Sequence, residues 1–191
     1  MSEELIIEHC SPTLAGIKTG NLFSVKITKR TDISREVREL NRVLREKGLR
    51  VIPLKIAKKY ALIYLYRPDH LKKDLNDPKA LSILKNRGYE PADPEHCITQ
   101  LIRHLQSDDA FPHEIGLFLG YPPSDVACFM KNPREGVQCS GCWKAYSDPG
   151  KAEETFYRFK KCTEWYHHMN QNGKSLAQLA VKTNGKCAGS L

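Results

Sequence analysis

The feature that most restricts the fold is a pair of β-rich runs separated by only three residues. The runs cover Arg50–Ile56 and Tyr60–Arg67, and Ala57-Lys58-Lys59 lies between them. Because a parallel connection needs a dozen or more residues, the pair predicts an antiparallel hairpin. Alternate positions of the second run are apolar or aromatic on both faces, which is typical of a strand inside a sheet. We therefore expect the second run to be a central strand.

Segments with helical spacing surround this hairpin. We expect helices over Asp32–Gly48, Pro68–Leu75, Asp77–Asn86, Asp93–Leu105, Ser124–Met130 and a long stretch from Asp148 to just before Gly173. A short strand is expected at Leu5–His9, followed by a helix that begins at Ser11-Pro12, and an edge strand is expected within Gly136–Tyr146. Residues 1–173 then form a single α+β domain, with a small, mostly antiparallel sheet of three or four strands surrounded by helices. Residues 174–191 are expected to hold a short helix and a flexible tail.

Composition narrows the class of protein. Of 191 residues, 40% are hydrophobic and 27% are charged, which excludes wholly disordered and low-complexity classes. No apolar run approaches the roughly 20 residues that span a bilayer, and the acidic start Met1–Glu4 differs from a secretory signal. We expect no membrane partner and a cytosolic location. The 7 cysteines are spread over the chain, so reduced thiols are favoured over a disulfide framework.

The positive charge is concentrated in one segment. The chain has 30 basic and 22 acidic residues, net +8, while residues 26–67 hold 13 basic and 4 acidic residues, net +9. Arg35, Arg38, Arg42 and Arg45 share the face of the predicted helix opposite its apolar stripe. This face could contact an anionic partner, nucleic acid included. Acidic neighbours and the lack of interleaved aromatic residues instead favour an ordinary solvated face.

Cys10 is the cysteine with the best case for reactivity. At a junction between a strand and a helix, the first helical N–H groups would favour a thiolate and lower the thiol pKa below about 8.5. Lys18 would add positive charge if the helix continues past Gly16. The alternative is a small, buried apolar residue, which is common for free cysteine.

His113 and Glu114 form a second candidate site. A histidine near a thiolate can act as general base, and a carboxylate can orient that histidine. The alternative is structural, with His113 as a capping or hydrogen-bonded residue and Glu114 as a favourable charge at a helix N-terminus.

Cys139 and Cys142 form a C-x-x-C pair. Such a pair supplies half of a zinc site or a dithiol, but zinc needs two further ligands and no second C-x-x-C exists. Cys162, Cys10 or the histidines at 167 and 168 would have to complete the site through the fold. We therefore predict that no metal is held by Cys139 and Cys142 alone, and we favour a structural role for both.

Three segments resemble an uncharacterised bacterial family known only as a domain of unknown function. They are His9-Cys10-Ser11-Pro12-Thr13-Leu14-Ala15-Gly16-Ile17-Lys18, Phe111-Pro112-His113-Glu114-Ile115-Gly116-Leu117-Phe118-Leu119-Gly120-Tyr121-Pro122, and Cys139-x-Gly141-x-Trp143-Lys144. The resemblance implies no established activity. It includes a cysteine matched by Cys162, does not require Cys142, and has glycine where this chain has Cys128. It also implies that the first and middle motifs form one site.

Two functions follow as hypotheses. The first is a thiol-dependent site, for redox chemistry, metal handling or nucleophilic catalysis, built from Cys10, His113 and Glu114, with Cys139 and Lys144 as further members. The second is a non-enzymatic binding or scaffold module that uses the face from Arg35 to Arg45. The sequence leaves open whether the protein is an enzyme, which cofactor it uses, and whether its partner is a small molecule or a protein.

Overall fold

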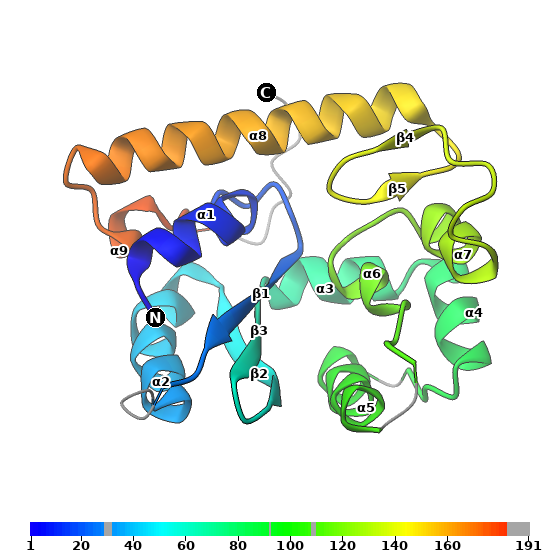
Figure 1. Ribbon diagram of the computed structural model, residues 1–191, viewed down its shortest axis with the longest axis horizontal. Coiled ribbons are helices and arrows are strands. Elements are labelled where there is room, and N and C mark those ends of the chain that lie inside the picture. The colour runs from blue at the N-terminus through cyan, green and yellow to red at the C-terminus, as the bar shows by residue number, and fades with distance from the viewer. Residues whose placement is uncertain (29–31, 92, 108–109, 183–191) are drawn as a thin grey trace. The chain divides into compact units, whose positions relative to one another are not determined.

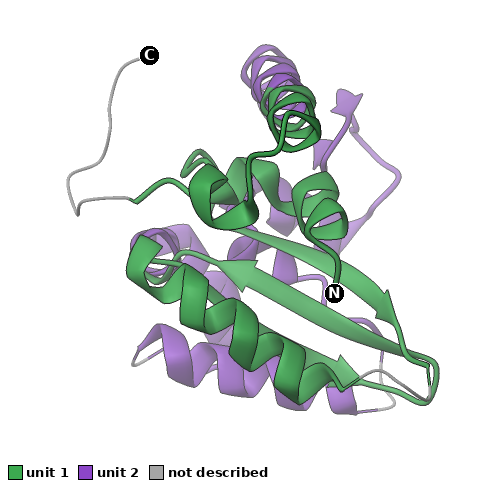
Figure 2. Cartoon of the chain, turned by 90° about the vertical axis from the view of Figure 1, so that its left-hand side faces the viewer, with its two compact units in different colours: residues 1–69, 162–191 green, residues 70–161 purple. Residues whose placement is uncertain are grey.

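The computed structural model describes residues 1–28, 32–91, 93–107 and 110–182 (Figure 1). The chain divides into two compact units, shown in separate colours in Figure 2. Unit 1 comprises residues 1–69 and 162–191, and unit 2 comprises residues 70–161. The expected tail from residue 183 onward lies outside the described residues. The prediction of a single domain over residues 1–173 stays a prediction, and each unit is described by itself.

Unit 1 is an α+β unit, in line with the predicted fold class. It contains α1 (Glu3–Leu14), β1 (Gly20–Lys26), α2 (Ile33–Leu44), a 3-10 turn η1 (Arg45–Lys47), β2 (Arg50–Ile56), β3 (Tyr60–Tyr66) and α9 (Leu176–Leu179). The second part of α8 (Pro149–Gln171), from Cys162 onward, also belongs to this unit. The three strands form one antiparallel sheet in the order β1-β3-β2. The predicted hairpin is confirmed, and β3 is its central strand.

The sheet of unit 1 packs one face into the core. Ala61, Ile63 and Leu65 lie on this face of β3, in one buried cluster with residues of α1, α2 and α9. On the opposite face, the rings of Tyr64 and Tyr66 stack with centroids 4.7 Å apart. Five of the seven residues of β3 are buried, so the expected burial of both faces is confirmed for most of the strand.

The first segment of the chain is a helix, and the strand expected at Leu5–His9 was a wrong prediction. Ser2 caps α1 by accepting a hydrogen bond from Leu5 N at 3.2 Å. Residues 6, 7, 10 and 14 are buried along one side of α1. This spacing is helical, but the apolar run at Leu5–His9 is too short to distinguish a helix from a strand. Pro12 lies inside the last turn of α1 and does not start a helix. The third strand of the sheet is β1 instead.

A buried arginine ties distant segments of unit 1 together. Arg67 is 1% exposed and donates to the carbonyls of Thr13 at 2.7 Å, Leu14 at 2.7 Å, Lys47 at 3.2 Å and Val181 at 2.8 Å. The first two are carbonyls that a helix C-terminus leaves without helical partners. Arg67 therefore satisfies the end of α1 and joins it to the C-terminal segment.

Unit 2 is mainly helical. Its elements are α3 (Pro68–Leu75), which begins in unit 1, α4 (Pro78–Asn86), α5 (Pro94–Gln106), α6 (Ile115–Phe118), α7 (Pro123–Lys131), the short strands β4 (Cys139–Ser140) and β5 (Lys144–Ala145), and the first part of α8. Asp77 and Asp93 cap α4 and α5 at the positions expected from the sequence. The edge strand expected within Gly136–Tyr146 is the antiparallel β4–β5 pair.

Candidate functional site

Unit 2 contains a cavity of about 380 Å³ that is lined mainly by apolar atoms. Its wall comes from three segments: the region of α6, the helix α7, and the β4–β5 hairpin. The lining residues are His113, Ile115, Gly116, Leu119, Tyr121, Asp125, Val126, Phe129, Ser140, Gly141, Cys142, Trp143 and Lys144. The middle and last of the three sequence motifs therefore meet at this cavity.

Two glycines allow the wall to pack closely. A Cβ atom at Gly116 would lie 2.9 Å from Val126 Cγ2, and one at Gly141 would overlap the ring of Phe156. A larger residue at either position would require the side chain of Val126 on α7, or the ring of Phe156 on α8, to move. The glycines of both motifs thus serve close approach of neighbouring elements.

Asp125 holds the hairpin in place. This side chain is 3% exposed and accepts four hydrogen bonds. The donors are Trp143 Nε1 at 2.9 Å, Tyr146 N at 3.1 Å, Ser147 N at 3.1 Å and Ser147 Oγ at 2.8 Å. These partners follow Cys142 in the chain, so one carboxylate on α7 positions the whole second half of the hairpin.

Aromatic rings form much of the lining. The indole of Trp143 stacks on Tyr121 with centroids 5.1 Å apart and meets the ring of Phe156 edge-on at 4.5 Å. The ring of Phe129 meets the ring of His113 edge-on, with centroids 5.0 Å apart, and Lys144 Nζ lies 5.8 Å from the Phe129 centroid. Tyr121, Phe129 and Trp143 are all half-buried. Burial, followed by the charge of Cys142, raises the pKa of Tyr121, so its hydroxyl stays protonated.

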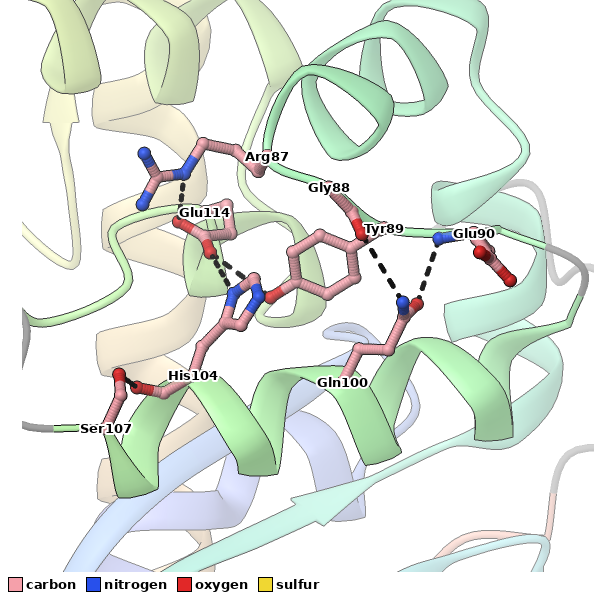
Figure 3. Close-up of polar contacts among 8 residues, drawn as sticks. All are labelled: Arg87, Gly88, Tyr89, Glu90, Gln100, His104, Ser107 and Glu114. Atoms are coloured by element: carbon pink, nitrogen blue, oxygen red, sulfur yellow. Dashed lines mark hydrogen bonds and ion pairs between the residues drawn. The ribbon is translucent and has the colours of Figure 1, made fainter.

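Glu114 is not among the residues that line the cavity and instead belongs to a separate polar cluster (Figure 3). Its Oε1 accepts from Tyr89 Oη at 3.2 Å and lies 3.1 Å from His104 Nδ1, while Arg87 Nε is 3.3 Å from Oε2. Burial, followed by the charge of Glu114, raises the pKa of Tyr89, which keeps this hydroxyl a donor. The carboxylate joins α5 and the end of α4 to the start of α6.

Glu114 therefore does not orient His113, contrary to our expectation. Glu114 is fully buried, whereas His113 is exposed and packs against the rings of Phe111 and Phe129. Adjacent residues before a helix point in different directions, and here the acid turns inward while the base turns to the cavity. His113 remains a cavity residue, and Glu114 is a structural one.

Cys10 is a core residue of unit 1. It lies in the middle of α1, is 0% exposed, and belongs to the hydrophobic cluster under the sheet. Burial raises its pKa, and the opposing charge of Lys18, which is 7% exposed, is too weak to reverse this. The expectation of a lowered pKa was wrong, because Cys10 is not at a helix N-terminus. A site shared with His113 stays a prediction, since the two residues belong to different units.

The remaining candidate thiols differ in how deeply they are buried and in what they contact. Cys139 is half-buried with its Sγ 3.8 Å from Pro149 O, Cys142 is exposed and lines the cavity, and Cys162 packs against the core of unit 1. Burial raises the pKa of Cys162 to about 11. Over the described ranges, no group of three or more His, Cys, Asp or Glu residues is placed to hold a metal ion.

The basic face of the second helix is exposed as predicted. Arg35, Arg38 and Arg42 on α2 and Arg45 on η1 are all exposed, and Arg35 Nε pairs with Glu39 Oε1 at 3.1 Å. An anionic partner for this face stays a prediction. No helix among the described residues is long and apolar enough to cross a membrane.

Sequence reasoning missed the residue that organises the cavity. Asp125 lies within the helix predicted over Ser124–Met130, and the sequence did not predict Asp125, Tyr121, Phe129 or Trp143 as members of a site. Trp143 belongs to the third sequence motif, near Gly141. A tryptophan close to a glycine was therefore the sequence signal that could have indicated this site. Lys144, a predicted binding residue, does line the cavity.

Comparison with known proteins identifies a family and no activity. The model of the family described as "Protein of unknown function (DUF3793)" matches residues 6–180. No curated protein and no solved structure matches the chain.

Proposed function

The chain belongs to the DUF3793 family, whose function is unknown, and we propose that it is a small-molecule-binding protein whose site is the cavity of unit 2. The observation that carries this proposal is the meeting of two sequence motifs around one cavity of about 380 Å³. Cavities of roughly 300–1,000 Å³ with apolar walls and a few polar groups are typical of small-molecule sites.

The shape of the wall favours a flat ligand. Tyr121 and Trp143 stack directly on each other, with 29° between their ring planes and centroids 5.1 Å apart, so together they present one aromatic surface to the cavity, and Phe129 contributes a third ring. Aromatic side chains interact most favourably with another ring in offset-stacked or edge-on contact. The proposed ligand is therefore planar and mainly apolar.

The cavity residues are held in place before any ligand arrives. Asp125 fixes the hairpin through four hydrogen bonds, and Glu114 fixes the start of α6 through three side-chain partners. Preorganisation of this kind lowers the entropy lost on binding. Both buried carboxylates thus support a binding role by holding the segments of the cavity wall in place.

Binding can be tested with the neutral fluorescent probe N-phenyl-1-naphthylamine. We expect saturable, one-to-one binding with enhanced probe fluorescence, and about a fivefold to tenfold loss of affinity in Phe129→Ala, since one stacking face is removed. Tyr157→Ala is the matched control, because Tyr157 is an exposed ring of the same unit, 62% accessible, outside the cavity.

Absence of saturable binding by the folded protein would overturn the proposal. Equal losses in Phe129→Ala and Tyr157→Ala would overturn it too, because the probe would then be on the general surface.

The thiol-dependent site has less support than the cavity. Its central residue is a buried thiol whose pKa is raised, which disfavours the reactive thiolate. A cytosolic location remains part of the proposed function.

A further inference from the structure

Charge is distributed unevenly around the cavity. Asp125 is the carboxylate among its lining residues, and His113 and Lys144 are the basic groups. Asp125 is 3% exposed, whereas His113 is exposed and Lys144 is half-buried. The negative charge is therefore deep in the wall and the basic groups are nearer to solvent.

Most of the acceptor capacity of the Asp125 carboxylate is used within the protein. Oδ1 accepts from Tyr146 N, Ser147 N and Ser147 Oγ, and Oδ2 accepts from Trp143 Nε1. Because this carboxylate is 3% exposed and already serves four donors, a positively charged ligand would gain little from it. An anion placed deep in the cavity would meet like charge.

Lys144 and His113 both lie near the ring of Phe129. Lys144 Nζ donates to Pro133 O at 2.9 Å and is 5.8 Å from the centroid of Phe129, and the His113 ring meets the Phe129 ring at 75°. An ammonium group has three donors, and the bond to Pro133 uses one. Phe129 holds both basic side chains at the wall, where they can approach an anionic group.

We propose that the ligand is a planar ring system with one anionic group, such as an aromatic carboxylate. The inference rests on the proposed function. The ring stacks among Tyr121, Phe129 and Trp143, and the anionic group lies beside Lys144 and His113, away from Asp125. A cationic ring is disfavoured because Lys144 Nζ already lies over the ring of Phe129 and because the buried Asp125 carboxylate already accepts four hydrogen bonds.

Three probes of one shape separate these alternatives: 2-naphthoate, the neutral 2-naphthamide, and the cationic 2-naphthylmethylamine. Titration calorimetry at low salt is expected to show 2-naphthoate binding at least fivefold more tightly than 2-naphthamide, and the amine weakest. The preference for 2-naphthoate should shrink as salt is raised, since the charges are near solvent.

Substitutions at Lys144 locate the charge. Lys144→Met should remove most of the preference for 2-naphthoate while it leaves 2-naphthamide affinity within twofold, and Lys144→Arg should retain the preference. Lys151→Met is the matched control, because Lys151 is an exposed lysine of unit 2 outside the cavity.

The outcomes distinguish the two proposals. If 2-naphthamide binds as tightly as 2-naphthoate, or if Lys144→Met leaves the preference intact, the anionic assignment is wrong and the cavity remains a binding site. If none of the probes binds to the folded protein, both proposals fail.

Discussion

Each unit contains a buried charged side chain with four hydrogen-bonding contacts, but the surroundings of the two differ. Arg67 in unit 1 donates to four carbonyls inside a closed core. Asp125 in unit 2 accepts from four donors beside an open cavity. Satisfying a buried charge is therefore a structural requirement in both units, and only the unfilled space next to Asp125 indicates a ligand site.

The units also differ in charge. Unit 1 has 17 basic and 9 acidic residues, net +8, and unit 2 has 13 of each, net zero. The basic face and Cys10, which the sequence made most conspicuous, both belong to unit 1. The cavity belongs to the neutral unit, so net charge alone does not lead to the proposed binding site.

The largest expected effect tests whether the two units differ in how tightly they are packed. Ile63→Asp places a charge at a position that is 0% exposed, and we expect a loss of about 4 kcal/mol in the free energy of unfolding. Phe129→Asp, at the half-buried cavity wall, should cost about 1 kcal/mol because water reaches the site. Urea denaturation followed by circular dichroism measures both. Equal losses would contradict the contrast between a closed core and an open wall.

A second substitution tests whether Asp125 organises the cavity. Asp125→Ala leaves Trp143 Nε1 and two backbone N–H groups without their acceptor, so we expect about 3 kcal/mol of destabilisation and loss of N-phenyl-1-naphthylamine binding. Asp148→Ala removes an exposed cap from Lys151 N at the start of α8. It should cost about 1 kcal/mol and leave probe binding unchanged. Retained binding in Asp125→Ala would show that the hairpin does not depend on this carboxylate.

The thiols provide a comparison of reactivity between the units. We expect iodoacetamide to modify Cys142 at least tenfold faster than Cys10 at pH 7.5, because Cys142 is exposed while Cys10 is buried with a raised pKa. A tenfold ratio corresponds to about 1.4 kcal/mol. Burial raises the pKa of Cys162 to about 11, so the rate at which iodoacetamide modifies Cys162 should increase only as the pH approaches that value.

Peptide mass spectrometry after timed labelling gives the rate at each site. Faster labelling of Cys10 than of Cys142 in the native protein would restore the thiol-dependent hypothesis and contradict the difference in thiol reactivity between the two units.

The smallest expected effect concerns the basic face. Arg35→Ala removes an exposed ion pair with Glu39, and we expect a stability change of about 0.3–0.5 kcal/mol that disappears in high salt. Thermal melting at low and high ionic strength measures it. A loss above about 1 kcal/mol would mean that this face has a structural role that solvation does not explain.

Much of the secondary structure was predictable because its signals are local. Asp77 and Asp93 cap their helices where aspartate followed by proline indicated a start, and the three-residue gap before Tyr60 imposed an antiparallel pair. Leu5–His9 was misread because a five-residue apolar run is compatible with either a strand or one face of a helix. Cys10 and Leu14 follow this run at a spacing that is typical of one face of a helix.

The candidate site was predictable only in part. His113 and Lys144 were identified and do line the cavity, whereas Glu114 was assigned to the wrong cluster. Its partners, Tyr89, His104 and Arg87, come from segments 10 to 27 residues earlier, and nothing in the local motif shows which way the side chain turns.

By itself, the sequence determined the hairpin, most helix starts and the exposed arginine face, since periodicity, capping and chain length act over a few neighbouring residues. Only the tertiary structure decided that Cys10 is buried, that Glu114 turns inward and that Asp125 joins α7 to the hairpin beside a cavity. The physical reason is that burial, pKa and open space depend on which distant segments pack around a residue, and those contacts are made only when the chain folds.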